Sequence, residues 1–139
     1  MTQPHDVLFA SQQYQQWLAA LKDKAMLATH NQAQAMMRAV LQELRDSVSD
    51  EDALAIANAL PALPRGIMLE GWRLGRKKHV VASREAFQAA LERRLGAHSP
   101  PPDDLTEAAF AVLCKALGRA AGEAVCGVLP AALQPLWKA

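Results

Sequence analysis

The sequence predicts an all-α protein, a helical bundle of about eight helices. Its 139 residues are 51% hydrophobic, which is enough to bury a core, while aromatic residues make up only 5%. Alanine is abundant, whereas the β-branched and aromatic residues that strands favour are scarce. Apolar residues also recur at spacings of three and four, as on a helix with one buried face. The length fits a single domain over residues 1–139.

The first two helices are expected over residues 11–25 and 32–48. Each segment carries one apolar stripe with helical spacing. Asn31 and Gln34 stand three residues apart and can form a capping box at the start of the second helix.

A third helix should begin after Ser49, a good N-cap that is followed by acids at the positive end of the helix dipole. Pro61 suits the first position of a fourth helix. Proline disfavours a helical conformation in the residue before it, so Leu60 should leave the helix and form a corner. Leu129 and Pro130 repeat this pattern and should form a second corner.

Residues 72–83 are expected to be a connector, because they contain several basic residues and no helical stripe. Ser83 is the expected N-cap of a fifth helix. Asp104 and Glu107 have the spacing of a capping box for a sixth. Gly118 should interrupt that helix and leave a short seventh one. An eighth helix should run from Pro130 to Trp137.

The two halves of the sequence resemble each other, which predicts two similar four-helix halves over residues 8–71 and 84–137. The matches occur in the same order, at offsets of 73, 72 and 69 residues. Residues 14–18, 39–41 and 60–62 match residues 87–91, 111–113 and 129–131. We interpret this as duplication of a four-helix unit, in which each copy buries an apolar face against the other.

Segments 37–46, 60–72 and 129–137 carry a resemblance to a bacterial family catalogued as domain of unknown function 2267. The resemblance extends from about Phe9 to Trp137. It implies an all-helical prokaryotic domain, and it supplies no established activity or catalytic residues that could be carried over to this chain. The chain departs from the family pattern at Met68 and Leu69, where aromatic residues are frequent, and at Pro64, where an aliphatic residue is frequent. An aromatic site at these positions would be absent from this chain.

Charge is unevenly distributed and indicates a candidate ligand or partner surface. Residues 1–70 hold 5 basic and 8 acidic residues, whereas residues 71–139 hold 10 and 6. The surface would combine the end of the fourth helix with the basic connector. Its members are Arg65, Glu70, Trp72, Arg73, Arg76, Lys77 and Lys78. The simpler structural interpretation is a helix stopped by Gly71, with Trp72 folded back into the core and Arg65 paired with Glu70.

Three functions remain open. The favoured one is a protein-interaction or self-association module without catalytic activity, with a protein partner or a homo-oligomer. The second is a small-molecule or anion-binding protein, conceivably an enzyme, that uses Arg65, Glu70 and Trp72. The third is nonspecific nucleic-acid binding by the basic connector, which is less expected because no nucleic-acid motif is present. No cofactor and no metal are expected, since the four histidines and two cysteines lack the spacing of ligands.

The protein is expected in the cytoplasm, without contact with a membrane. No run of about 18 apolar residues is present. Asp6 lies where a signal peptide would be basic, and only a short apolar run follows it. Cys114 and Cys126 are then interpreted as small core residues rather than a redox pair.

Overall fold

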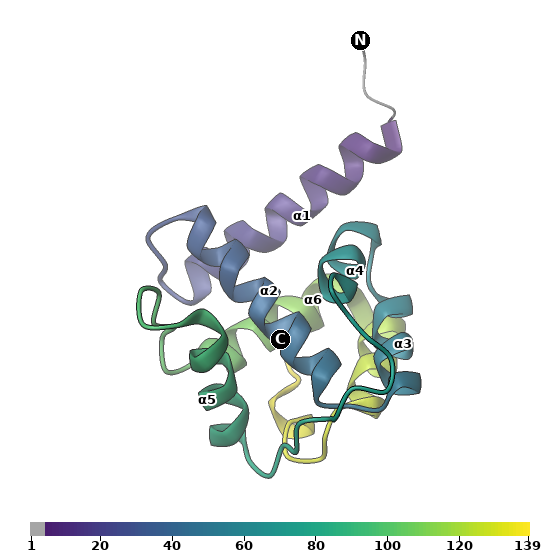
Figure 1. Cartoon of the computed structure of the whole chain (residues 1–139). Coiled ribbons are helices and arrows are strands. Elements are labelled where there is room, and N and C mark those ends of the chain that lie inside the picture. Colours follow the sequence, from purple (N-terminus) through teal and green to yellow (C-terminus); the bar gives the residue numbers. More distant parts are fainter. Residues whose placement is uncertain (1–4) are drawn as a thin grey trace.

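A computed structural model describes residues 5–139 and contains α-helices, one short 3₁₀ helix and, over this range, no strand (Figure 1). The all-α prediction is therefore confirmed. The elements are α1 (His5–Lys24), α2 (His30–Asp46), α3 (Asp50–Ala59), α4 (Ala62–Leu69), α5 (Arg84–Leu95), α6 (Leu105–Val128) and the 3₁₀ helix η1 (Gln134–Leu136).

Helix α2 lies at the centre of the bundle and contacts each of the other α-helices (Figure 1). Ten of its residues are buried, including the charged residues Glu43, Arg45 and Asp46 near its C-terminal end. A helix surrounded in this way buries polar as well as apolar positions, and buried charges require partners. The C-terminal end of α2 therefore carries buried charges whose partners must come from α2 itself or from neighbouring elements.

Helix α1 is longer than expected, because it begins at His5 rather than at residue 11. Its buried stripe starts at Tyr14, whose hydroxyl donates a hydrogen bond to Gln34 Oε1 of α2 at 2.5 Å. The turns before Tyr14 are helical but project beyond the other helices (Figure 1). The prediction missed these turns because they contain no buried stripe.

Both predicted capping boxes are wrong. The box that opens α2 is formed by Thr29 and Gln32. Asp104 makes no capping hydrogen bond with its side chain. Glu107 instead binds the guanidinium of Arg84, at 2.7 Å. A charged partner from another helix thus replaces the local cap.

Both predicted corners are present. Leu60 ends α3 with extended backbone angles (φ −87°, ψ 147°), and Leu129 ends α6 in the same way (φ −67°, ψ 148°). Both side chains are buried. Pro61 takes the N-cap position of α4 rather than the first helical position, and Pro64 is buried within the first turn, where no amide hydrogen is needed.

The expected count of about eight helices is wrong, since residues 5–139 form six α-helices and one 3₁₀ helix. Gly118 interrupts α6 with non-helical angles (φ 77°, ψ −172°), yet the helical turns continue to Val128. After Pro130 the chain forms turns and η1 instead of an eighth α-helix. This last segment is too short and irregular for a run of helical hydrogen bonds.

Positions matched between the two halves are buried as predicted. The four pairs are Leu18 with Leu91, Val40 with Val112, Leu41 with Leu113, and Leu60 with Leu129. Apolar residues from all six α-helices join in one buried cluster. The arrangement as two similar halves stays a prediction. Cys114 and Cys126 are half-buried free thiols of α6, so their assignment to the core is wrong.

Candidate functional site

Arg65 of the predicted surface supports the corner between α3 and α4. Its Nε donates to the carbonyl of Ala57 and its Nη2 to that of Leu60, both at 2.8 Å. These carbonyls belong to the last turn of α3, where helical partners are lacking. The guanidinium therefore supplies hydrogen-bond donors to carbonyls at the end of α3, where the helical hydrogen-bond pattern stops.

Glu70 does not pair with Arg65, and the expected ion pair between them is wrong. Glu70 Oε2 instead accepts a hydrogen bond from Arg38 Nη1 of α2 at 2.7 Å. The side chain of Arg38 is 38% exposed and that of Glu70 is 62% exposed, so solvent screens the pair and it contributes little to stability. Arg65 and Glu70 thus serve different neighbours.

Trp72 is half-buried against the core rather than sealed in it. Its indole Nε1 is buried and has no hydrogen-bond partner. Lys78 Nζ lies 5.9 Å from the centre of its ring, which is within reach of a cation–π contact. Lys78 also forms an ion pair with Asp50, at the start of α3.

The remaining basic residues of the connector, Arg73, Arg76 and Lys77, are exposed. No ion pair involves them in the part of the chain that the structure describes. Of the seven predicted site residues, the structure thus brings Trp72 and Lys78 together, whereas Arg65 and Glu70 contact other neighbours.

A buried charge network, which the sequence analysis missed, lies at the C-terminal end of α2. The side chains of Glu43 and Asp46 are only 2% and 4% exposed. Arg94 of α5 bridges them: its Nε lies 2.7 Å from Glu43 Oε1, and its Nη2 contacts Asp46 Oδ2. His79 Nδ1 lies 2.7 Å from the other carboxylate oxygen of Glu43, Oε2.

Arg45 compensates Asp46 from within α2. Its Nε is 2.9 Å from Asp46 Oδ1, and its Nη1 donates to the carbonyls of Met68 and Glu70. Burial alone would raise the pKa of Asp46, but hydrogen bonds from Arg45 and Arg94 outweigh burial and hold the pKa below its ordinary value. Asp46 is therefore a permanently charged member of the network at neutral pH.

The network fastens the connector to the bundle. The backbone N–H of His79 donates to the carbonyl of Asp46 at 2.8 Å. Upstream, the N–H of Gly75 donates to Asp50 Oδ2 at 3.1 Å. The acids at 43 and 46 share a helix face, which is a detectable signal. Their partner Arg94 comes from 48 and 51 residues away, a distance that no local pattern spans.

A second feature is the projecting end of α1. Val7, Leu8 and Phe9 are 49%, 42% and 59% exposed, and they lie in the turns that extend beyond the bundle (Figure 1). We call residues 5–13 the overhang. Successive residues of a helix point about 100° apart, so these three apolar side chains are exposed on different sides of the overhang.

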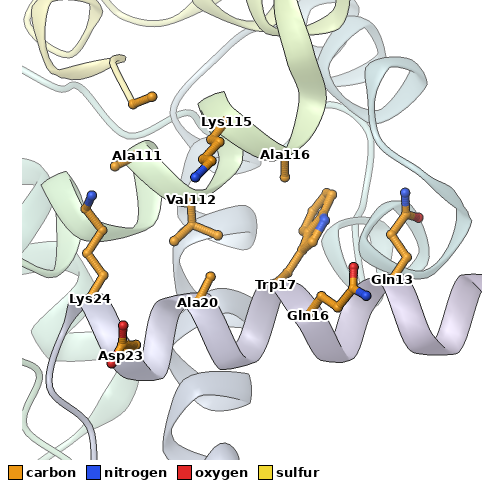
Figure 2. A pocket seen from close by; sticks show the side chains of 11 residues that line it. Gln13, Gln16, Trp17, Ala20, Asp23, Lys24, Ala111, Val112, Lys115 and Ala116 are labelled. Carbon is orange, nitrogen blue, oxygen red and sulfur yellow. The ribbon is translucent and has the colours of Figure 1, made fainter.

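An open groove of about 570 Å³ lies along the junction between α1 and α6. Its apolar part comprises Trp17, Ala20, Ala111, Val112 and Ala116. Figure 2 shows Lys24 of α1 and Lys115 of α6 reaching into the space between the two helices. We call this space the α1/α6 groove.

Within residues 5–139, no group of three or more potential ligands is arranged to hold a metal ion. None of the described helices is long and apolar enough to cross a membrane.

The fold and these features define an all-helical domain with a buried charge network and a projecting apolar helix end. Residues 14–136 match the family described as "Uncharacterized conserved protein (DUF2267)", and the chain belongs to this family. The resemblance carried by segments 37–46, 60–72 and 129–137 is thereby confirmed. No curated protein matches the sequence significantly.

Proposed function

We propose that this protein is a helical interaction module that associates with a second copy of itself through the overhang of α1. The observation that carries the proposal is the exposure of three consecutive apolar residues, Val7, Leu8 and Phe9, on the helical turns of α1 that precede its buried stripe. A short helical segment has little stability in water unless its apolar side chains pack against something. A partner helix would supply that packing.

The alternative of a small-molecule or anion site at Arg65, Glu70 and Trp72 has weaker support. Arg65 is engaged by the carbonyls of α3, and Glu70 by Arg38. A ligand would have to displace these contacts before it could reach the charged groups.

Nucleic-acid binding has one supporting observation, the exposure of Arg73, Arg76 and Lys77. Lys78 and His79 of the same segment are already bound to Asp50 and Glu43. Three exposed cations beside a single half-buried aromatic residue, Trp72, make a weak electrostatic contact. We therefore favour a protein partner.

The test is the molar mass in solution between micromolar and millimolar concentration, measured by light scattering. The proposal predicts that the mass of the wild-type chain rises toward that of a dimer. A variant with Val7, Leu8 and Phe9 replaced by serine should stay monomeric over the same range. At micromolar concentration, where the wild type is monomeric too, its urea midpoint should be unchanged because these residues lie outside the core. A wild-type chain that is monomeric at every concentration would refute the proposal.

A further inference from the structure

We infer a specific geometry for the self-association: α1 pairs antiparallel with α1 of a second copy, and Phe9 of each chain enters the α1/α6 groove of the other. The inference deepens the proposed function and rests on it. The overhang and the groove would then be the two halves of one self-complementary surface, as a two-fold dimer requires.

The first argument is that Phe9 and the groove lie on the same face of α1. Gln13, Gln16 and Ala20 line the groove. Phe9 precedes Gln13 by four residues, and the spacings four, three and four from Phe9 to Ala20 keep all of them on one side of a helix with 3.6 residues per turn. The groove face therefore continues along α1 onto the overhang, where Phe9 is 59% exposed.

The second argument is size. A two-fold axis midway between Gln13 and Gln16 places Phe9 of one chain opposite Ala20 of the other. Ala20 is the smallest residue of α1 on this face, and beside it the groove is lined by Trp17 and Val112. The large ring of Phe9 thus meets the small side chain of Ala20, with an apolar surface next to it. The two-fold axis makes this contact occur twice in the dimer.

The third argument is charge. Asp6 and Lys24 are 18 residues apart, which is five helical turns, so they lie on the same edge of α1 about 27 Å apart. Antiparallel pairing about the same axis brings Asp6 of one chain to Lys24 of the other. Lys115, which reaches into the groove from α6, lies along this edge as well. Asp6, Lys24 and Lys115 have no ion-pair partner among residues 5–139.

The opposite edge is complementary too. His5 and Asp23 are also 18 residues apart, and the same two-fold axis places His5 of one chain beside Asp23 of the other. One register of α1 therefore satisfies the large-to-small contact and both pairs of opposite charges. Pairing in the parallel direction would set Phe9 against Phe9 and Ala20 against Ala20, so the large-to-small contact would be lost.

A competing geometry uses the other side of the overhang. Val7 precedes Tyr14 and Leu21 by seven and fourteen residues, so it prolongs the buried stripe of α1 rather than the groove face. A dimer that packed beneath the overhang would depend on Val7 and not on Phe9.

The experiment exchanges the charges of Asp6 and Lys24. Sedimentation equilibrium of the full chain measures the dissociation constant of the dimer for each variant. Asp6→Lys and Lys24→Asp should each weaken the dimer by about fivefold or more, since each occurs twice in it. The double variant Asp6→Lys/Lys24→Asp should restore the wild-type constant to within about twofold. Because the two residues are too distant to meet within one chain, restoration reports contact between chains.

The matched control combines Asp6→Lys with Lys22→Asp, which has the same net charge but alters the side of α1 away from the groove. It should not restore the dimer. Phe9→Ser should weaken the dimer at least tenfold, whereas Leu8→Ser should change it less than twofold. Circular dichroism of each variant verifies that the helices are retained.

Failure of the exchange to restore the dimer would overturn the geometry, as would a loss of affinity with Val7→Ser but not with Phe9→Ser. In either case a wild-type dimer would leave the proposed self-association standing. A wild-type chain without a dimer would refute both.

Discussion

Arg94 is the side chain on which the buried charge network depends most, because it is the one that touches both buried carboxylates. It contacts Glu43 and Asp46 while remaining 24% exposed itself. Removing one partner of a buried pair leaves an uncompensated charge in the protein interior, which costs far more than the loss of a surface pair.

We expect Arg94→Met to lower the free energy of unfolding by about 3 kcal/mol, the lower end of the range for buried pairs, because Arg94 is partly exposed. The neighbouring exposed residue provides the control: Arg93→Met should change stability by about 0.5 kcal/mol or less. Urea unfolding of both variants measures the difference. Equal effects would mean that the network does not stabilise the fold.

Asp46 gives the network a dependence on acid. Its pKa in the folded protein is lowered, so its charged form contributes stability above the pKa of the unfolded chain, about 3.9, and this contribution is lost as the pH falls through the lower folded value. The wild-type urea midpoint should therefore fall more steeply as the pH drops below about 4 than that of Asp46→Asn. Asp104→Asn, at an exposed carboxylate without an ion pair within residues 5–139, should keep the wild-type slope.

At the scale of elements, α6 is shaped by one glycine. Gly118 has a φ of 77° and a ψ of −172°, a conformation that is essentially restricted to glycine. It redirects α6, so that the part after it runs along α3 toward the corner at Leu129.

Gly118→Ala should destabilise the protein by about 1–3 kcal/mol, because alanine is strained at this φ and ψ. Gly127, in the same helix, has ordinary helical angles and open space around it, so Gly127→Ala should stabilise by up to about 1 kcal/mol. The two thermal unfolding midpoints should thus move in opposite directions. A shift of both midpoints in the same direction would contradict the role assigned to Gly118.

Elements with a clear periodic signal could be predicted from the sequence, as could the corners. Leu60 and Leu129 leave their helices because the following proline excludes the helical conformation, a purely local effect. The first capping box was predicted wrongly because several polar pairs near the start of α2 have the right spacing. The second was predicted wrongly because Glu107 forms an ion pair with Arg84 of another helix. The overhang was missed as a helix because its apolar residues do not form a buried stripe.

At the scale of the whole molecule, the side-chain partners and the groove depend on contacts between residues far apart in the sequence, which no local pattern predicts. Arg65 and Glu70 were expected to pair in the simpler interpretation of this helix end, but Arg65 binds carbonyls of α3 and Glu70 binds Arg38 of α2. The exposure of Phe9, and the groove that α1 forms with α6, follow from where α1 leaves the bundle. The internal repeat predicts that the two halves superpose, with Leu41 and Leu113 at equivalent places in the core.

The central claim, that the overhang of α1 is a self-association surface, is tested most directly by amide hydrogen exchange of residues 9–13. These amides have acceptors within α1, and their protection depends on whether the overhang stays helical. The account predicts that their protection rises with protein concentration from micromolar to millimolar. Their protection should rise more than that of residues 41–44 of α2, which are in the core and gain only the added stability of the dimer. Rapid exchange of residues 9–13 that is the same at every concentration would contradict the claim.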